Sequence, residues 1–252
     1  MKIIFIHHSS FAVCMEEHIL IFDYFSKDKM PDCNFSGIFP DFPEDAKLYF
    51  FSSHKHIDHF DMDNYRFREK YKNAKYIISK DAKLSPNNLK KHGLDFVNKD
   101  FVTYVSAGEK YEIDGMTIKT FKSTDSGVAF LIEVEGKTIY HAGDLNDWVW
   151  EGAGELVNGK MTSEYRHQIN KLSAVNIDIA FVPIDSRQEQ HMYKGIDYFM
   201  NNVNAKHVFP MHFWHKYEVI DDYISRISNG AFADRIVRVH NENEVFEEDS
   251  FK

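Results

Sequence analysis

The chain reads Lys47-Leu48-Tyr49-Phe50-Phe51-Ser52-Ser53-His54-Lys55-His56-Ile57-Asp58-His59 near the end of its first quarter. The aromatic run predicts a buried strand that ends just before a cluster of metal-ligand side chains. If the chain leaves the strand still extended, His54 and His56 point to the same side, so both imidazoles can converge on one metal ion. Asp58 and His59 follow from a turn and can reach a second ion, because paired ions lie only about 3.5 to 4 Å apart.

Coincidence explains the pattern His-x-His-x-Asp-His poorly. The chain has 14 histidines in 252 residues. The random expectation of the pattern at this composition is about 0.004 per chain. The alternative to a metal site is a solvated histidine-rich loop at a strand end, and the low expectation favours the metal site.

This segment resembles the signature of the metallo-β-lactamase-fold hydrolases. Other features follow in that family's order, so the resemblance extends over nearly the whole chain and is strongest to the single-domain, lactonase-like branch. His8-Ser9-Ser10-Phe11 resembles the Gly-His-Ala-Ser-Phe turn of that branch, and Asp23 matches the aspartate that ends an early strand and supports the metal loop. Ile139-Tyr140-His141-Ala142-Gly143-Asp144 resembles the strand ending in Gly-Asp, whose carboxylate bridges two ions. His212 matches the last metal-ligating histidine.

The later matches are individually weak, because a Gly-Asp pair also makes ordinary turns and a lone histidine is often a core residue. Their order, and their place at strand ends, favour ligands, since strand ends hold side chains more rigidly than free loops do. The ligand set that the resemblance implies is His54, His56, Asp58, His59, Asp144 and His212.

One departure from the family concerns the first metal site. Family members usually carry another histidine before the strand at residues 128–134, and here Thr120 to Gly127 contains none. The expected position falls near Ser123, and the nearest competent ligand is Asp125. Asp125 replacing the imidazole would shift preference toward harder ions such as Mn or Fe. Two alternatives stay open. The first site binds its ion weakly, which leaves one firmly bound ion, or the centre is degenerate and the protein binds a ligand without turning it over.

The remaining pattern predicts many strands and a few helices. Expected strands cover Lys2–Ile6, Phe11–Met15, His18–Phe22, Lys47–Phe51, Lys75–Ser79, Phe101–Ser106, Lys110–Ile113, Thr117–Phe121, Val128–Val134, Lys137–His141, Ile177–Pro183, Ala205–Met211 and Arg235–Val239. Expected helices cover Met62–Tyr71, Ser163–Val175, Gly195–Val203 and Glu218–Ile227. The dipeptide Glu135-Gly136 predicts a tight hairpin. This mixture implies an α/β fold of two packed sheets covered by helices. The resemblance implies a four-layer αββα sandwich of two mixed β-sheets, and the absence of a linker predicts a single domain over residues 1–252.

Composition limits the partners and the compartment. The 30 Lys and Arg against 39 Asp and Glu give a net charge of -9, which argues against general nucleic-acid or anionic-membrane binding. Two cysteines, Cys14 and Cys33, fit a reducing compartment. The apolar run at the amino terminus is cut short by His7 and His8, so it reads as a strand rather than a signal peptide. We therefore expect a cytoplasmic protein with a small-molecule substrate, without nucleic acid or membrane; the oligomeric state stays open.

The expected activity follows from the metal. A bound ion lowers the pKa of its water to about 7, so a metal-bound hydroxide can attack an ester, lactone, amide or phosphodiester. The expected cofactor is one or two divalent ions, zinc first, with Mn or Fe as alternatives. Asp58 is the candidate catalytic residue, which orients the nucleophile or accepts its proton. The competing hypothesis is a non-catalytic metal- or ligand-binding module on a decayed hydrolase fold. An iron oxidoreductase is disfavoured because the motif carries His56 where the family's diiron branch has glutamate.

Two further residues are candidates for substrate binding. Arg187 follows an expected strand and could clamp a carboxylate or phosphate; pairing with Asp185 is the alternative. Trp148 lies close in sequence to Asp144 and could form an apolar wall. The alternative there is that a chain with 22 Phe and 13 Tyr places aromatic rings near everything.

Overall fold

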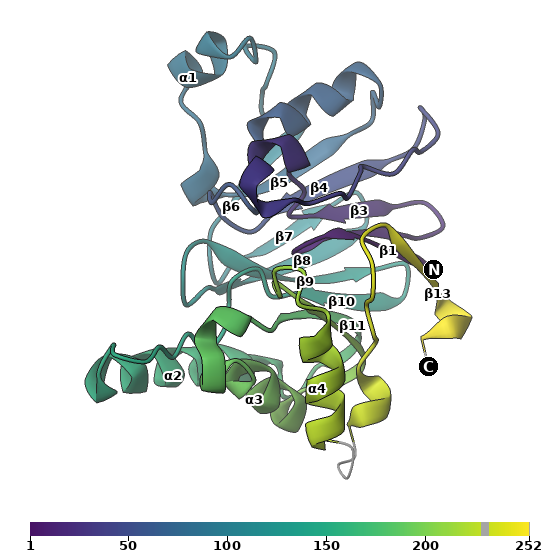
Figure 1. The fold of residues 1–252 in the computed structure, drawn as a ribbon. Coiled ribbons are helices and arrows are strands. Elements are labelled where there is room, and N and C mark those ends of the chain that lie inside the picture. Colours follow the sequence, from purple (N-terminus) through teal and green to yellow (C-terminus); the bar gives the residue numbers. More distant parts are fainter. Residues whose placement is uncertain (228–231, 252) are drawn as a thin grey trace. The chain divides into compact units, whose positions relative to one another are not determined.

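The computed structural model describes residues 1–227 and 232–251. It contains two compact units, Met1–Ser106 with Glu242–Glu248, and Ala107–Asn241 with Asp249–Lys252. We call them the first and second units, and each holds one mixed β-sheet (Figure 1). The single domain expected over residues 1–252 stays a prediction.

The first unit contains a seven-stranded sheet in the order β13-β1-β2-β3-β4-β5-β6. Its strands are β1 (Lys2–His7), β2 (Ser10–Cys14), β3 (Ile19–Phe22), β4 (Leu48–Ser52), β5 (Lys75–Ser79), β6 (Val102–Val105) and β13 (Glu244–Glu247). Neighbours from β3 to β6 are parallel, and the other pairs are antiparallel. All of β4 is buried, which explains its unbroken apolar run, because parallel strands in the middle of a sheet are covered on both faces. This strand carries the metal-ligand motif at its carboxyl end.

Short helices cover the first unit's sheet. They are η1 (Lys27–Lys29), η2 (Pro31–Cys33), η3 (Met62–Glu69), η4 (Lys80–Ala82) and α1 (Pro86–Lys91). A further 3₁₀ turn, η8 (Glu248–Ser250), directly follows β13 in the chain. The helix expected over Met62–Tyr71 is present as η3, which is a 3₁₀ helix and ends at Glu69. Tertiary hydrogen bonds engage Asn64 there: its Nδ2 donates to the Tyr24 carbonyl (2.6 Å), and its carbonyl accepts from the Tyr76 hydroxyl (2.8 Å). Local periodicity cannot register such bonds.

The second unit contains a six-stranded sheet in the order β12-β11-β10-β9-β8-β7. Its strands are β7 (Lys110–Ile113), β8 (Met116–Lys122), β9 (Val128–Val134), β10 (Lys137–His141), β11 (Asn176–Pro183) and β12 (Asn204–Met211). The strands β10, β11 and β12 are parallel, and the others pair antiparallel. The expected hairpin between β9 and β10 is confirmed. Glu135 and Gly136 have φ of 47° and 71°, as a type I′ turn requires.

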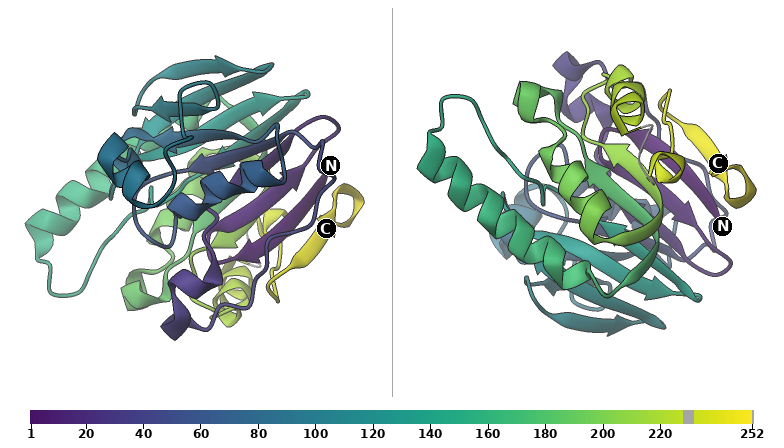
Figure 2. Two further views of the ribbon diagram at one scale, coloured as in Figure 1. Left: turned by 90° about the horizontal axis from the view of Figure 1, so that it is seen from above. Right: turned by 90° about the horizontal axis from the view of Figure 1, so that it is seen from below.

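Three α-helices lie on one face of the second unit's sheet (Figure 2, right). They are α2 (Glu155–Ile169), α3 (Lys194–Asn202) and α4 (Glu218–Ile227), with the 3₁₀ turns η5 (Asn170–Leu172), η6 (Ser186–His191) and η7 (Ala233–Arg235) between or after them. The ring of Tyr140 on β10 stacks on Phe199 of α3 at 5.5 Å, and the Tyr165 hydroxyl of α2 donates to the Gly195 carbonyl (2.7 Å). The first contact joins α3 to the sheet, and the second joins α2 to α3.

Two expected elements differ in extent or kind. The helix expected over Ser163–Val175 begins earlier in the structure, at Glu155. The pattern missed its first turn because the side chains there are exposed (Leu156 by 88%), so they leave no periodic apolar signal. The strand expected over Arg235–Val239 is wrong. Only Ile236 forms a bridge, to Val208, because the chain passes through η7 and meets the edge of β12 at one point. The α/β class with two mixed sheets flanked by helices is confirmed.

No helix in the described residues combines the length and the apolar character needed to cross a bilayer.

Candidate metal centre

The motif loop of the first unit is fixed by a buried carboxylate. Asp23 follows β3 with φ of 42°, and its backbone N–H donates to the Phe51 carbonyl of β4 (2.8 Å). Its Oδ1 accepts from the Ser53 backbone N–H and its Oδ2 from the Ser53 hydroxyl, both at 2.7 Å. Nδ1 of His59 lies 2.7 Å from the same Oδ2. Asp23 therefore supports both ends of the loop, as the family resemblance implies.

These hydrogen bonds also set the protonation of two histidines. A carboxylate only accepts, so Nδ1 of His59 carries the proton and Nε2 presents a lone pair. The Ser53 hydroxyl already donates to Asp23, so it accepts from Nδ1 of His54 (2.9 Å), which leaves the lone pair of His54 on Nε2. An imidazole ligand needs this tautomer, and a carboxylate on the remote nitrogen is the usual support of a metal-bound histidine.

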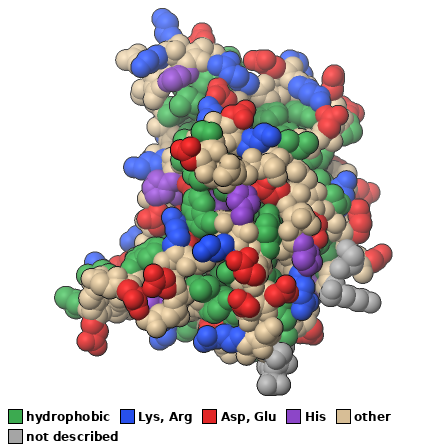
Figure 3. Space-filling view, in the orientation of Figure 1, with side chains coloured by type: hydrophobic (Ala, Val, Ile, Leu, Met, Phe, Trp, Pro, Cys, Tyr) green, Lys and Arg blue, Asp and Glu red, His purple; other side chains and the backbone are tan. Residues whose placement is uncertain are grey.

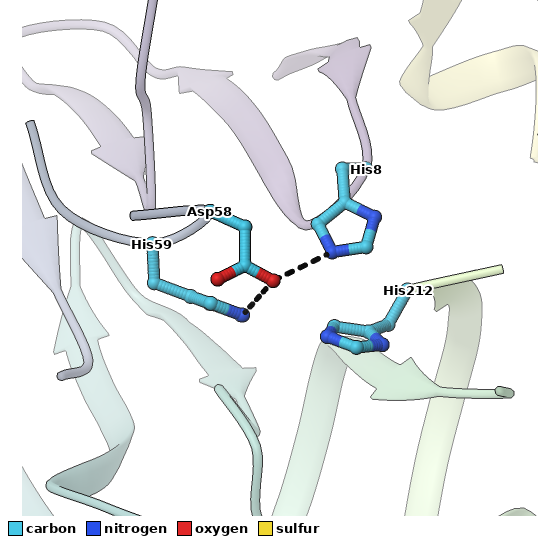
Figure 4. Close-up of side chains that lie close together, drawn as sticks. All are labelled: His8, Asp58, His59 and His212. Carbon is cyan, nitrogen blue, oxygen red and sulfur yellow. Dashed lines mark ion pairs between the residues drawn. The ribbon is translucent and has the colours of Figure 1, made fainter. Parts of the chain in front are cut away.

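The first unit gathers two groups of candidate ligands. His8, Asp58 and His59 offer ligand atoms within 4.8 Å of one another, and Figure 4 shows His8 and His59 both pointing at the Asp58 carboxylate. Nε2 of His8 lies 3.3 Å, and Nε2 of His59 3.6 Å, from Oδ2 of Asp58. In the second group, Nε2 of His54 lies 2.9 Å from Nδ1 of His56. Two imidazole nitrogens on one tetrahedral zinc ion lie about 3.3 Å apart, so both groups fit a divalent ion.

His8 was not among the ligands inferred from the motif. It follows β1 in a left-handed conformation with φ of 50° and is buried. A histidine that directly follows a buried strand, at the carboxyl side of the sheet, is the signal that could have identified it.

In the second unit, Asp144 and Asp125 come together. Asp144 follows β10 through Gly143, which has φ of 51°. Thr124 links the two loops: its hydroxyl donates to the Asn146 carbonyl (2.6 Å) and accepts from the Asn146 N–H (3.0 Å). Carboxylate oxygens of Asp125 and Asp144 consequently lie within 4.8 Å of each other. Two carboxylates so close favour a bound cation or a shared proton.

His212 repeats the arrangement of His59. It follows β12 with φ of 65° and is buried. Its Nδ1 lies 3.0 Å from Oδ2 of the buried Asp185, which follows β11, and its Nε2 lies 3.4 Å from Oδ1 of Asp144. Burial alone would raise the pKa of Asp185, but hydrogen bonds from His212 and Arg187 hold that pKa well below its usual range. Asp185 is thus a carboxylate, and His212 presents Nε2 toward Asp144.

The candidate substrate-binding residues have protein partners. The Arg187 guanidinium donates to both oxygens of Asp185 (3.0 Å from Nε to each) and stacks over the Trp214 ring at 4.7 Å. This is the Asp185 pairing that the sequence left open, although Asp185 itself is buried. Trp148 is buried, and its Nε1–H donates to the Asp144 carbonyl (2.8 Å). Both residues therefore support the groups around Asp144 and His212, and their contact with a substrate stays a prediction.

His141 has a structural role. Its Nδ1 accepts from the Gly143 N–H (3.1 Å), and its side chain is buried. The hydrogen bond helps to form the tight turn that delivers Asp144.

Solved structures share the fold at low sequence identity. Igni18, a metallo hydrolase from the archaeon Ignicoccus hospitalis, matches with a TM-score of 0.61 and 17% identity over 98% of both chains. Zn(2+)-bound PqqB from Methylobacterium extorquens matches with a TM-score of 0.56 and 12% identity over 98% of this chain and 100% of that one. CmlA, a diiron β-hydroxylase from Streptomyces venezuelae, matches with a TM-score of 0.63 and 12% identity over 98% of this chain and 54% of its own length.

No curated protein matches the chain significantly. The family model described as the beta-lactamase superfamily domain matches residues 2–151, which include β1 to β10, the whole motif loop and Asp144. With this match over more than half of its length, and with two mixed sheets and His/Asp groups at their strand ends, the chain belongs to the metallo-β-lactamase superfamily.

Proposed function

We propose that this protein is a metal-dependent hydrolase of small molecules. The observation that carries the proposal is the repeated geometry of His59 and His212. In each unit, a buried carboxylate holds Nδ1 of the histidine, and Nε2 faces a second carboxylate. This order of groups is typical of metal-binding histidines.

The proposed ligands are the six residues inferred from the sequence together with His8. We propose that they hold two divalent ions, with zinc expected from the imidazole-rich set. Asp125 takes the place of the missing first-site histidine, because Thr124 brings it beside Asp144. A harder ion such as Mn or Fe would suit a site with this carboxylate.

A divalent ion, when bound, lowers the pKa of a coordinated water and polarises a substrate oxygen. The remaining work falls to the chain. Asp58 lies beside both His8 and His59, so its carboxylate can orient the attacking group or accept its proton. Asp23 and Asp185 keep His59 and His212 in the required tautomer, which preserves the geometry through a reaction cycle.

The proposed substrate is a small ester, lactone, amide or phosphodiester. The net charge of -9 disfavours nucleic acid, and the face in Figure 3 intersperses Lys and Arg with Asp and Glu rather than gathering one sign. A cytoplasmic location remains part of the proposal, because a content of two cysteines fits a reducing compartment.

The deciding experiment is metal stoichiometry by elemental analysis, on protein purified without affinity-tag metals. We expect near two ions per chain in the wild type, near one in Asp125→Ala, and fewer in His59→Ala and His212→Ala. Asp178→Ala, on β11 and ion-paired with Lys206, is the control and should not change the count. Unchanged metal in all three site variants would overturn the ligand assignment.

Turnover of generic ester and phosphodiester substrates then separates a hydrolase from a binding module. Metal-dependent turnover that Asp58→Asn abolishes supports the hydrolase. Stoichiometric metal without turnover of any substrate class would instead support the non-catalytic module.

A further inference from the structure

A pocket lies in the first unit beside the motif loop, and none of its lining residues is a candidate metal ligand. It has a volume of about 410 Å³, within the range of small-molecule sites. It is lined by Lys29, Lys55, Ile57, Phe60, Asp61, Met62, Asp81, Ala82, Lys83 and Leu84. We call it the lysine-rimmed pocket. Lys55 and Ile57 are the two variable positions of the motif, so an occupant would contact the loop that carries the candidate ligands.

The floor of the pocket is apolar and firmly supported. Phe60, Met62 and Leu84 pack against the hydrophobic core of the first unit, and Ala82 belongs to that core. Ile57 adds to the lining an apolar side chain that is 51% exposed. A β-branched side chain left in water beside an apolar floor is a preformed contact for an apolar ligand group.

The charges of the rim leave a positive balance. Asp61 is buried and accepts from the Ser26 and Asp63 backbone N–H groups (3.2 and 3.0 Å), and Lys29 pairs with both Asp61 and Asp63 (3.3 and 2.6 Å). Lys29 is thus already neutralised. Within the described residues, neither Lys55 nor Lys83 takes part in an ion pair, and Lys83 lies only over the Tyr104 ring, at 5.1 Å. Against these two ammonium groups stands Asp81, which already accepts from the Lys55 backbone N–H (3.3 Å).

We propose that the lysine-rimmed pocket binds a small amphipathic anion, an alkyl chain that ends in a carboxylate or phosphate. The chain would lie on Phe60, Met62 and Leu84, and its head group would meet the ammonium groups of Lys55 and Lys83. Lysine suits either head group, because it acts as a point charge without a preferred planar geometry. Such a site is distinct from the proposed metal centre, because none of its lining residues is a candidate ligand.

The test is isothermal titration of the full-length protein with octanoate and octyl phosphate, with and without a chelator. Octanol and octylamine share the chain and lack the anion. We expect both anions, or one of them, to bind at least about fivefold more tightly than octanol, and octylamine to bind most weakly. The stronger of the two anions identifies the head group. Equal affinity for octanol, or no binding of either anion up to its solubility, would overturn the proposal.

Matched variants locate the site. Lys55→Gln with Lys83→Gln should weaken anion binding about fivefold and leave octanol unchanged, whereas Lys80→Gln, an exposed neighbour outside the pocket, should leave both unchanged. Ile57→Asp should abolish anion binding, and Ile38→Asp, which changes an exposed isoleucine outside the pocket in the same unit, should not. Equal losses in the variant and its control would place binding elsewhere. Because metal content is measured separately, failure here is distinct from failure of the metal centre.

Discussion

Oδ2 of Asp23 lies 2.7 Å from Nδ1 of His59, and both side chains are fully buried. The same oxygen accepts from the Ser53 hydroxyl, which in turn accepts from His54. One carboxylate at the end of β3 therefore fixes the tautomers of two candidate ligands. In the second unit, Asp185 at the end of β11 does the same for His212. Both units thus use a carboxylate after one strand to orient a histidine after the next strand of the sheet.

Replacing Asp23 by asparagine should weaken metal binding although no ligand is removed. The amide can donate as well as accept, so Nδ1 of His59 is no longer forced to carry the proton. Loss of such a partner costs about 10- to 100-fold in metal affinity. Competition with a chromophoric chelator measures it. Asp61→Asn changes a buried aspartate that has no histidine partner within the described part of the chain, so it should retain wild-type affinity. A folded Asp23→Asn protein with unaltered affinity would contradict the role of Asp23.

Substitution of Arg187 tests whether this residue supports His212 or binds the substrate. Its side chain is 52% exposed, and the guanidinium donates to Asp185, which holds His212. If it acts through Asp185, Arg187→Gln should lower metal affinity, by less than Asp185→Asn does, and should leave KM unchanged at saturating metal. If it clamps a substrate, KM should rise while metal affinity stays the same. Parallel chelator titrations and steady-state kinetics on the two variants separate these outcomes.

Much of the fold could be predicted because its strands are local apolar runs bounded by polar or turn residues. Lys75–Ser79 and Val128–Val134 coincide with β5 and β9 for this reason. By contrast, β13 contains two apolar residues between glutamates, and it forms only because β1 offers an edge. The α1 helix is six residues long, too short for a periodic signal.

The candidate site, like the fold, has one part that local sequence predicts and another part that depends on tertiary contacts. The spacing of His54, His56, Asp58 and His59 lies within one loop and can be read from the chain. The bond between Asp185 and His212 joins residues 27 positions apart, and the place of His8 beside Asp58 depends on how β1 and β4 enter the sheet. Linear spacing carries neither relationship.

Alanine substitutions at Gly195 and Gly159 test the contact between α3 and the loop after Asp144. A Cβ on Gly195 would collide with Oδ1 of Asn146, whose Nδ2 donates to Gln188 (2.9 Å). Gly195→Ala should therefore destabilise the protein by about 1 to 3 kcal/mol, the usual cost of overpacking. Gly159 lies inside α2 with open space around its Cβ position. Gly159→Ala should stabilise the protein by about 0.5 to 1 kcal/mol. Urea unfolding of both variants checks the opposite signs, and equal effects would contradict the packing.

Ionisation of the buried Asp147 carboxyl should lower the free energy of unfolding as pH rises. Burial raises the pKa of its carboxyl, and the hydrogen bond from Thr162 together with the charges of Lys194 and Arg166 only partly offsets this. The folded state therefore binds the proton more tightly than the unfolded state, so stability is lost as pH rises from the unfolded pKa through the raised folded pKa. Asp147→Asn keeps an acceptor for Thr162 and removes the buried charge. It should unfold at a higher temperature than the wild type at neutral pH, and the difference should vanish below the unfolded pKa of about 3.9.

Thermal unfolding across this pH range measures the difference in unfolding temperature. Thr162→Val is the control, because it removes the hydrogen bond and keeps the charge. A variant less stable than the wild type at neutral pH would show that the ionised carboxylate is stabilising here.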